Sequence, residues 1–409
     1  MAMMPAGAGS GPPPPLVPLC VTAWTQVSAV GTGSVALLQA LRERRSGLVA
    51  NDLTHEPLAT WIGRVPGLEQ AGNALPVTLA DLDSRNNRLA WLGLRTDGFM
   101  EQAHAAIRRY GAERVALVVG TSTSSIGATE EAYRGLLPDG GFPPRLAAPA
   151  LHMPHSLGVF VQRALDLHGP CVTVATACSS SANAFAYAER LVRLGLCDAA
   201  VVAGVDSLCD SVLFGFNSLG LVSTRPCRPF DAARDGISLG EAAGFALLER
   251  DGIGPWLLGH GESSDAHHMS APHPQGEGAR RAIGRALAGG GIPAARIDYI
   301  NLHGTASRKN DEVEAAVVAE LFPAGICASS TKGWTGHTLG AAGMLEAVIT
   351  CLALENDLAP GTLNCDTPDG PHGGSILRQN VERPLHLALS HSFGFGGSNC
   401  VLLFGRQRP

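Results

Sequence analysis

A cysteine lies where an apolar stretch of the sequence gives way to a helical pattern. Residues 172–175 read Val-Thr-Val-Ala and precede Cys178, after which apolar residues recur at three- or four-residue steps, at Ala182, Phe185, Ala188, Leu191 and Val192. At a strand-to-helix turn, unpaired backbone N–H groups and the positive end of the helix dipole favour the thiolate, the reactive form of cysteine. Cys178 is therefore a candidate nucleophile, although free cysteines are also common as small core residues.

Two histidines occupy polar turns in the second half of the chain. His303 ends an apolar strand just before a glycine, a usual place for site residues, and its neutral ring can donate a hydrogen bond. His337 lies in the glycine-rich segment 329–346, between Lys332 and Glu346. A lone histidine could be purely structural, and the lysine and glutamate could be an ordinary surface ion pair. The chemical interpretation needs all of these groups in one place.

A fourth segment, 391–399, reads His-Ser-Phe-Gly-Phe-Gly-Gly-Ser-Asn. Its glycines would let backbone N–H groups approach a substrate oxygen, while Phe393 and Phe395 cover it. The segment is a candidate oxyanion hole. A glycine-rich hairpin turn is the alternative interpretation.

The ten cysteines stand at irregular positions with no CxxC pair, which indicates reduced thiols and a cytoplasmic protein. Cys178, His303 and His337 also lack the short spacings of zinc ligands, so we expect no metal. A net charge of −6 provides no electrostatic footprint for nucleic acid. Nowhere do about 18 consecutive apolar residues occur, so we expect no membrane span.

The candidate residues need a framework, and the pattern predicts an α/β protein. Continuous apolar runs at 115–119, 172–175 and 199–203 alternate with helical patterns rich in alanine and leucine. Such runs are typical of buried, largely parallel sheets that are covered on both faces. A hydrophobic content of 45% in 409 residues is enough for a large core.

A faint internal repeat suggests two similar halves. The strand-and-turn pattern that starts at Arg114 recurs in character at Arg296. We expect a disordered tail at 1–15, rich in Ala, Gly and Pro, then a first half at 16–252 with the cysteine and a second half at 253–409 with the histidines.

The four segments, in this order, resemble the β-ketoacyl-acyl carrier protein synthases of the Cys-His-His type, from about Val21 to Phe404. The segment 228–244 adds the motifs RPFD, RDG and GEAAG, in which Ala242 replaces the usual glycine of the family. The resemblance implies a thiolase-like α/β fold with two duplicated halves in a layered α-β-α-β-α arrangement.

The resemblance also implies roles for the candidate residues. Cys178 would be the nucleophile, and His303 and His337 would bind the carbonyl of a malonyl thioester. Phe395 would be a gate beside Phe393, and the backbone N–H groups of Cys178 and Phe395 would form the oxyanion hole. The groups expected to orient the histidines and balance their charge are Lys332, Glu346, Asp311 and Glu314.

Substrate and partner residues follow from the same resemblance. Thr305 and Ser307 would bind the phosphopantetheine arm of an acyl carrier protein, with Ser307 keeping the hydroxyl of the family's threonine. Arg85 and Arg88 would dock that acidic carrier. Thr123 would lie at the mouth of the acyl pocket. The sequence around it resembles that of the family branch that builds aryl polyene pigments.

The expected reaction is a decarboxylative Claisen condensation, with substrates carried on phosphopantetheine and no covalently bound cofactor. A thiolase would need a second cysteine, for which Cys400 is the only candidate, and that residue more plausibly points into the sheet. A chain-length factor, a silent partner of such synthases, would lack the nucleophile. A homodimer is the default, with a heterodimer containing a chain-length-factor-like chain as the alternative.

Overall fold

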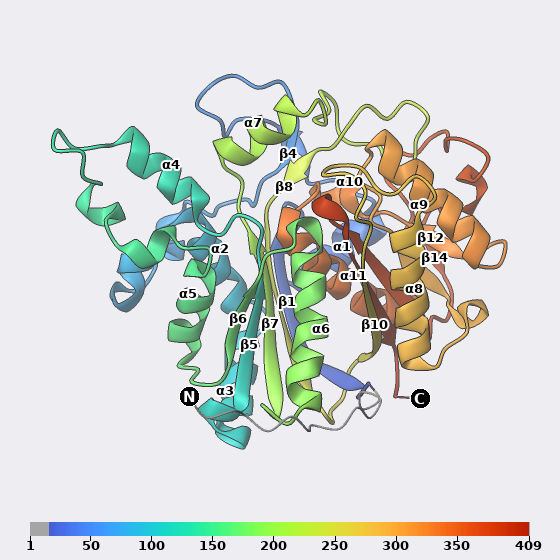
Figure 1. The fold of residues 1–409 in the computed structure, drawn as a ribbon, viewed down its shortest axis with the longest axis horizontal. Coiled ribbons are helices and arrows are strands. Elements are labelled where there is room, and N and C mark those ends of the chain that lie inside the picture. Colours follow the sequence, from blue (N-terminus) through green and yellow to red (C-terminus); the bar gives the residue numbers. More distant parts are fainter. Residues whose placement is uncertain (1–15, 409) are drawn as a thin grey trace, which may run out of the picture.

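The computed structural model describes residues 16–408, so the tail expected at 1–15 lies outside the described residues. A mixed sheet of eleven strands runs through the molecule in the order β12-β11-β15-β16-β10-β1-β9-β7-β5-β6, with β2 paired to β1 (Figure 1). The strands are β1 (Leu19–Ser28), β2 (Gly31–Thr32), β5 (Val115–Gly120), β6 (Cys171–Val174), β7 (Ala199–Asp206), β9 (Ala242–Glu249), β10 (Trp256–Ser264), β11 (Tyr299–Asn301), β12 (Cys327–Ser329), β15 (Leu387–Phe393) and β16 (Ser398–Gly405).

The two ends of this sheet repeat one plan. Strand β5 lies between the parallel strands β6 and β7, and β11 lies between the parallel strands β12 and β15. In both ends an antiparallel strand follows, β9 or β16, and then β1 or β10. The sheet is therefore mixed, and the expectation of a largely parallel sheet is wrong. The predicted boundary at 252–253 falls between β9 and β10, and as a division into domains it stays a prediction.

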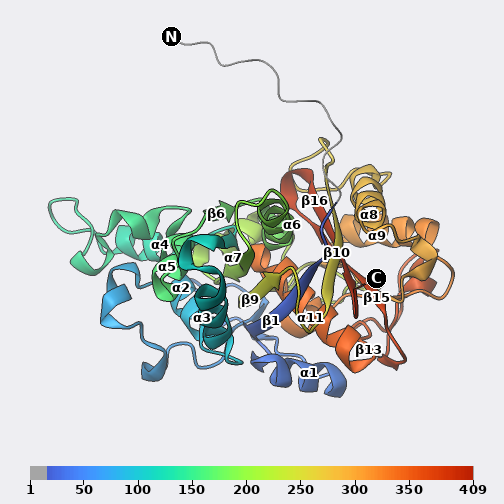
Figure 2. The ribbon, with the colours of Figure 1, turned by 90° about the horizontal axis from the view of Figure 1, so that it is seen from below.

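Helices form three further layers around this sheet, which gives the expected α-β-α-β-α arrangement. Helices α6 (Ser180–Arg193) and α11 (Ala342–Asn356) lie in the middle and contact strands of both halves. In Figure 2, α2 (Arg85–Leu94), α3 (Phe99–Tyr110) and α5 (Ser156–Leu165) lie on one outer side, and α8 (Glu277–Gly290) and α9 (Arg308–Leu321) on the other. The structure thus has two duplicated halves that share a central layer of two helices.

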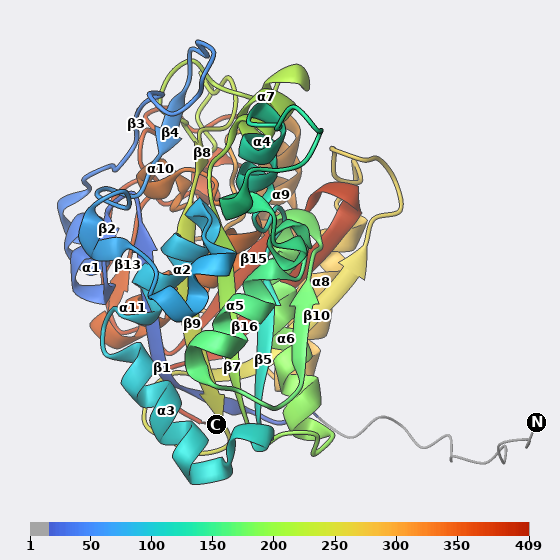
Figure 3. The same ribbon diagram turned by 90° about the vertical axis from the view of Figure 1, so that its left-hand side faces the viewer.

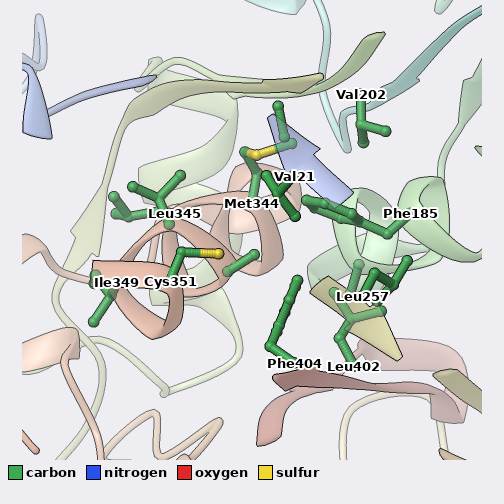
Figure 4. Packing of buried hydrophobic residues seen from close by; sticks show 14 of the residues in the cluster. Val21, Phe185, Val202, Leu257, Met344, Leu345, Ile349, Cys351, Leu402 and Phe404 are labelled. Carbon is green, nitrogen blue, oxygen red and sulfur yellow. The ribbon is translucent and has the colours of Figure 1, made fainter. Parts of the chain in front are cut away.

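The middle layer explains why α11 is apolar all round. Sheet strands and α6 surround the helix, so every residue from Ala342 to Leu354 is buried. Figure 4 shows Met344 of α11 beside Phe185 of α6 in the cluster that also contains Phe404. Within residues 16–408, the one stretch long and apolar enough to cross a membrane is Leu339–Asn356, and 89% of it is buried in the molecule. Burial of this kind is what a core helix shows.

Shorter elements cover the end of the sheet where the strands carry their polar turns. Two small sheets have the orders β3-β4-β8 and β13-β14. Figure 3 shows α4 and α7 together at the same end of the molecule as β4 and β8. The bounds are β3 (Val49–Ala50), β4 (Trp61–Gly63), β8 (Leu239–Gly240), β13 (Leu358–Ala359), β14 (Val381–Glu382), α1 (Ser34–Glu43), α4 (Ile126–Arg134), α7 (Asp210–Ser218) and α10 (Lys332–Thr335).

Candidate active site

Cys178 lies in the turn that connects β6 to α6, as the sequence predicts. A short 3₁₀ turn, Ala177–Ser179, brings the chain from the strand into the helix, and Ala177 takes a left-handed conformation with φ 52°. This uncommon conformation of a non-glycine residue turns the chain sharply before the helix. The cysteine side chain is buried, and its Sγ lies 3.0 Å from Nε2 of His337.

His337 occupies the corresponding connection of the second half, between β12 and α11. Its backbone is held on both sides, because its N–H donates to the carbonyl of Ser238 at 2.7 Å and its carbonyl accepts from the N–H of Gly240 at 2.9 Å. Gly336 just before it has φ 70°, a conformation that glycine adopts without strain. The duplicated fold therefore places Cys178 and His337 face to face at equivalent connections.

His303 completes the group from the end of β11. Its ring centroid lies 5.4 Å from that of His337, and the two rings are perpendicular, with an interplanar angle of 89°. Both oxygens of the Glu314 carboxylate accept backbone hydrogen bonds at this turn, from the N–H of His303 and of Gly304, each at 2.8 Å. Cys178, His303 and His337 each bring one side-chain atom within 4.8 Å of the other two. The structure brings the three candidates together, and their chemical roles stay predictions.

A buried ion pair lies beneath the histidines. The ammonium of Lys332 contacts the carboxylate of Glu346 and donates to the backbone carbonyl of His303 at 2.6 Å. Only 2% of the lysine side chain and 3% of the glutamate side chain are exposed, so this is not the surface pair of the alternative interpretation. Burial raises the pKa of Glu346 to about 7, against the opposing effect of Lys332.

Both imidazoles are neutral in this environment. Burial is the main cause that lowers the pKa of His303 and of His337 well below the usual value, and the positive charge of Lys332 adds to it in both cases. A neutral imidazole has one N–H donor and one acceptor nitrogen. The pair can therefore donate hydrogen bonds to a carbonyl oxygen while Nε2 of His337 interacts with the cysteine.

The resting state of Cys178 differs from the sequence-based expectation of a thiolate. Burial raises the pKa of the thiol to about 11, although the backbone N–H of Phe395 and the charge of Lys332 lower it. The helix start does favour the anion, but removal of the sulfur from water outweighs that effect. Cys178 is thus a neutral thiol in the free protein, and it needs a base at the moment of reaction.

We expect the alkylation rate of Cys178 by iodoacetamide to keep rising up to about pH 11. A pKa raised by about two units from 9 leaves about a hundredfold less thiolate at pH 7 than an ordinary cysteine has. The rate is followed as mass added to the peptide that contains Cys178. A rate that levels off below pH 9 would contradict the neutral thiol.

Phe395 and Phe393 lie beside Cys178 and His303, and their oxyanion-hole and gate roles stay predictions. The backbone N–H of Phe395 points at the sulfur of Cys178, which is why it lowers the pKa of the thiol. Gly396 and Gly397 after it have φ values of 78° and 79°, so this turn depends on glycine. The Phe395 ring stacks on Phe216 at 5.5 Å between centroids, and the Phe393 ring lies 5.9 Å from that of His303.

A small cavity of about 30 Å³ adjoins the three residues, which is room for one or two water molecules. Thr305 and Ser307 line it as the resemblance implies, with their hydroxyl oxygens 2.9 Å apart. The other wall is the segment 265–272, where Asp265 accepts a hydrogen bond from the side chain of Asn399 at 3.0 Å. The cavity therefore connects the sulfur to the residues expected to bind the substrate arm.

Asp311 lies behind the histidines without touching them. It accepts a hydrogen bond from the backbone N–H of Phe230 at 2.7 Å, and its other oxygen accepts one from Asn310 at 3.1 Å. Burial raises its pKa to about 6, although Arg234 lies 3.8 Å away. Its role is to hold the start of α9, which carries Glu314 one turn later.

The expected docking and pocket residues lie apart from the sulfur and have other partners. The guanidinium of Arg85 donates to the buried carboxylate of Glu241 at 2.5 Å and also contacts Glu69. Both carboxylates belong to this chain, so the charge of Arg85 is already paired within the fold. Arg88 donates to Asp83 at 2.6 Å. Thr123 does not line the cavity beside Cys178. The docking and pocket roles of these residues stay predictions.

One buried residue near the site escaped the sequence analysis, and a second, His391, was named there without a role of its own. Asp206, at the end of β7, accepts hydrogen bonds from the backbone and side chains of residues 121–123 and from the N–H of Gly340 at 2.6 Å. It thereby ties the turn after β5 to the turn before α11. His391 lies 3.1 Å from Glu314. A carboxylate that ends an apolar strand was the available signal for Asp206.

The cluster Cys178, His303 and His337 also has a composition that could bind a metal ion. Metal-bound histidines nearly always donate a hydrogen bond from the ring nitrogen that faces away from the metal. Here Nδ1 of His303 and Nδ1 of His337 are both buried without a partner among the described residues. This surrounding shell does not fit a metal site, and no step below depends on one.

Known proteins share this architecture. The chain matches the family model for the N-terminal domain of beta-ketoacyl synthase over residues 89–252 and the model for the C-terminal domain over residues 256–366. Over 260 residues it is 41% identical to 3-oxoacyl-[acyl-carrier-protein] synthase 2 of Rhizobium meliloti (strain 1021), an alignment that covers 59% of this chain and 62% of that protein. Over 324 residues it is 36% identical to Nodulation protein E of the same organism, covering 74% of this chain and 80% of that protein.

A solved structure extends the similarity to nearly the whole chain. A chain in the structure of the ketosynthase ApeO in complex with its chain length factor ApeC, from Xenorhabdus doucetiae, superposes with a TM-score of 0.87 at 35% identity, over 98% of this chain and 100% of that chain. The duplicated layers and a cysteine at the junction of the halves define a thiolase-like fold. Together with the matched models, they show that this chain belongs to the β-ketoacyl synthase family of acyltransferases.

Proposed function

We propose that this chain condenses an acyl group held on Cys178 with malonyl-acyl carrier protein, and so extends the acyl chain by two carbons. The observation that carries the proposal is the 3.0 Å contact between Sγ of Cys178 and Nε2 of His337, with His303 beside them. A nucleophile next to a base, with two further hydrogen-bond donors at the same point, is the arrangement that acyl transfer requires.

In the first half-reaction, the sulfur of Cys178 attacks the thioester carbonyl of an acyl carrier. The thiol proton passes to Nε2 of His337 as the new C–S bond forms, and the backbone N–H groups of Cys178 and Phe395 stabilise the oxyanion. The tetrahedral intermediate then expels the carrier thiolate, which takes up the proton. The neutral imidazole supplies the base that a thiol with a pKa of about 11 needs.

In the first half-reaction the proton of the neutral His337 ring lies on Nδ1, which leaves Nε2 as the base. In the second half-reaction it lies on Nε2, and the malonyl thioester binds with its carbonyl oxygen at the N–H groups of His303 and His337. Loss of CO₂ moves the electron pair of the breaking C–C bond into the thioester, and the two imidazoles stabilise the resulting enolate. The enolate carbon attacks the acyl carbonyl and forms the new C–C bond, and the tetrahedral adduct then collapses with cleavage of the C–S bond. The sulfur of Cys178 leaves as a thiolate and takes up a proton from water, which restores the neutral thiol. Lys332 helps to position His303 for this step, because its ammonium donates a hydrogen bond to the backbone carbonyl of that residue.

Release of ¹⁴CO₂ from malonyl-labelled carrier protein tests the proposal against a thiolase reaction. We expect release that depends on prior acylation of the protein, with a product two carbons longer by mass spectrometry. Condensation of two acetyl thioesters without CO₂ release would instead indicate that the protein catalyses a thiolase reaction. Cys400, which such a reading needs near the sulfur, is fully buried in β16.

The carrier, the oligomer and the compartment belong to the same proposal. Substrates arrive on the phosphopantetheine of an acyl carrier protein, and the chain acts in the cytoplasm as a dimer. The solved ketosynthase ApeO is in complex with a chain length factor, and so is the ishigamide ketosynthase, which has a TM-score of 0.86 at 27% identity. These neighbours support a heterodimer beside the default homodimer, and the intact site favours this chain as the catalytic member.

A product of the aryl polyene type would need room in the acyl pocket. Thr123 is proposed to lie at the mouth of this pocket, where its small side chain would leave room for a long, rigid chain. We expect Thr123→Ile to shorten the products by at least one two-carbon unit, read by mass spectrometry of the acyl carriers. Because the hydroxyl of Thr123 donates to Asp206 at 2.9 Å, Thr123→Val is the matched control. Equal shortening in both variants would trace the effect to Asp206, and unchanged length in the isoleucine variant would contradict a gating role.

A further inference from the structure

A second cavity opens next to the catalytic one. It has a volume of about 310 Å³ and shares five of its lining residues with the cavity at Cys178, at positions 270–272 together with Ser307 and Asn310. Its remaining wall comes from the start of α9, from His268 and from residues 220–221 and 235–236. A thioester arm that passes Ser307 on its way to the sulfur therefore spans both cavities.

Two positive charges at this outer cavity have no partner. Arg308 and Lys309 begin α9, line the cavity and are exposed. Within residues 16–408, neither side chain takes part in a hydrogen bond or an ion pair. The sequence contains only two lysines, and the other one is the buried Lys332. Lys309 is thus the single lysine of this chain that can meet a ligand from solvent.

The acidic groups nearby do not cancel these charges. Asp235, across the cavity, is occupied by Arg225 at 3.2 Å and by the hydroxyl of Ser223 at 2.6 Å. Glu312, one turn further along α9, is exposed and makes no contact with Arg308. In a chain of net charge −6, the outer cavity therefore has an excess of positive charge. An anion that enters here finds two unpaired donors.

We propose that Arg308 and Lys309 form a phosphate subsite, which takes the phosphate of the phosphopantetheine arm while its thioester lies at Cys178. The inference rests on the proposed function and adds to it the recognition of the arm's outer end. The arm carries its thiol at one end and its phosphate at the other, and the cavity at Cys178 and the outer cavity adjoin along the residues that they share. A guanidinium binds phosphate oxygens in pairs, and a neighbouring ammonium adds a point charge.

The test compares two small thioesters that differ only in the phosphate, acetyl-phosphopantetheine and acetyl-pantetheine. Transfer of the acetyl group to Cys178 releases the free thiol and adds the acetyl mass to the protein, so intact-protein mass spectrometry gives both rate constants. For the unaltered protein we expect about a five- to tenfold preference for the phosphorylated thioester at low ionic strength. The double variant Arg308→Gln/Lys309→Gln should reduce that ratio to near one.

The control variant is Arg296→Gln, which removes an exposed arginine at the opposite end of β11 and should keep the full preference. A ratio that stays within twofold of the original in the double variant overturns the subsite. The subsite is also overturned if the double variant slows acyl transfer only from carrier-bound substrates. Arg308 and Lys309 would then contact acidic residues of the carrier protein and not the phosphate.

Calorimetric binding of phosphopantetheine and of pantetheine separates this inference from the proposed function. If neither thioester acylates the protein but phosphopantetheine still binds more tightly, and loses this advantage in the double variant, the subsite stands and the acyl-transfer proposal fails. If acylation proceeds with no preference and no difference in binding, the acyl-transfer proposal stands and the subsite fails. If the protein is neither acylated nor binds either compound, both are overturned.

Discussion

Replacement of Cys178 with alanine should lower the rate of acyl transfer from an acyl carrier by at least about 10⁴-fold. Loss of a nucleophile that works together with a base removes the covalent route altogether, and the remaining groups cannot substitute for it. Cys178→Ser should be nearly as inactive, because a hydroxyl with a far higher pKa would have to give its proton to the neutral His337. Two quantities are measured: the acyl mass added to the protein, and then the amount of condensation product.

Cys171→Ala is the matched control for this experiment. Cys171 is a half-buried cysteine at the start of β6, only seven residues from the nucleophile, and it has no contact with the two imidazoles. This variant should keep its acylation rate within about twofold. An acyl adduct on the protein with Cys178→Ala, at any other residue and at a comparable rate, would exclude Cys178 as the acyl carrier of this enzyme.

Replacement of Lys332 with methionine should destabilise the protein by about 3–5 kcal/mol at pH 8. The variant leaves the carboxylate of Glu346 buried without its positive partner, and it removes the hydrogen bond to the carbonyl of His303. The loss is measured as the free energy of unfolding in urea. The double variant Lys332→Met/Glu346→Gln removes both charges and should recover part of it.

The same variant should lose less stability at low pH. Burial raises the folded-state pKa of Glu346 to about 7, above the unfolded value of 4.5, and loss of Lys332 raises it further. A group with a raised pKa stabilises the folded state below its unfolded pKa, and this contribution is lost as the pH rises through the folded value. Both proteins lose this contribution equally up to about pH 7, so the penalty of Lys332→Met should grow only as the pH rises above about 7, where Glu346 ionises in the unaltered protein and stays protonated in the variant. A penalty that does not change between pH 7 and pH 9 would show that the lost charge is not its cause.

Lys332→Met should also change how activity depends on pH. The lysine contributes to the low pKa of both His303 and His337, so its removal raises those pKa values. Acid conditions then protonate the imidazoles, and a protonated His337 cannot accept the thiol proton. The acid limb of the pH profile should move to higher pH in this variant, which a purely structural effect would not produce.

The sequence predicted the fold and the grouping of Cys178, His303 and His337 better than it predicted their electrostatics. Cys178 and His303 could be placed at strand ends from local patterns, and the faint repeat at Arg114 and Arg296 marks the central strands of two equivalent sheets, β5 and β11. The mixed sheet was missed because the predicted parallel runs all lie near one edge. An apolar run predicts a strand but not the direction of its neighbours, so the antiparallel strands between the two ends could not be recognised as antiparallel.

The errors at the site have one physical cause. Whether Cys178 is a thiol or a thiolate depends on how completely it is buried, and residues that lie around it, such as His337 and Phe395, are at least 159 positions away in the sequence. Arg85 was read as a surface charge because its partner Glu241 lies 156 residues further along the chain. Local sequence shows which groups are present, and only the packed chain decides which of them keep their charge exposed.

The equivalent positions of Cys178 and His337 bear on how such a site could have arisen. A single half-length unit that paired with its own copy would present the same residue from both sides of the twofold axis, either two cysteines or two histidines. Covalent joining of the two copies in one chain removes that constraint, because each copy can then change by itself. A sulfur on one side and an imidazole on the other, at equivalent positions, are therefore open to a duplicated chain and closed to a symmetric pair of identical halves.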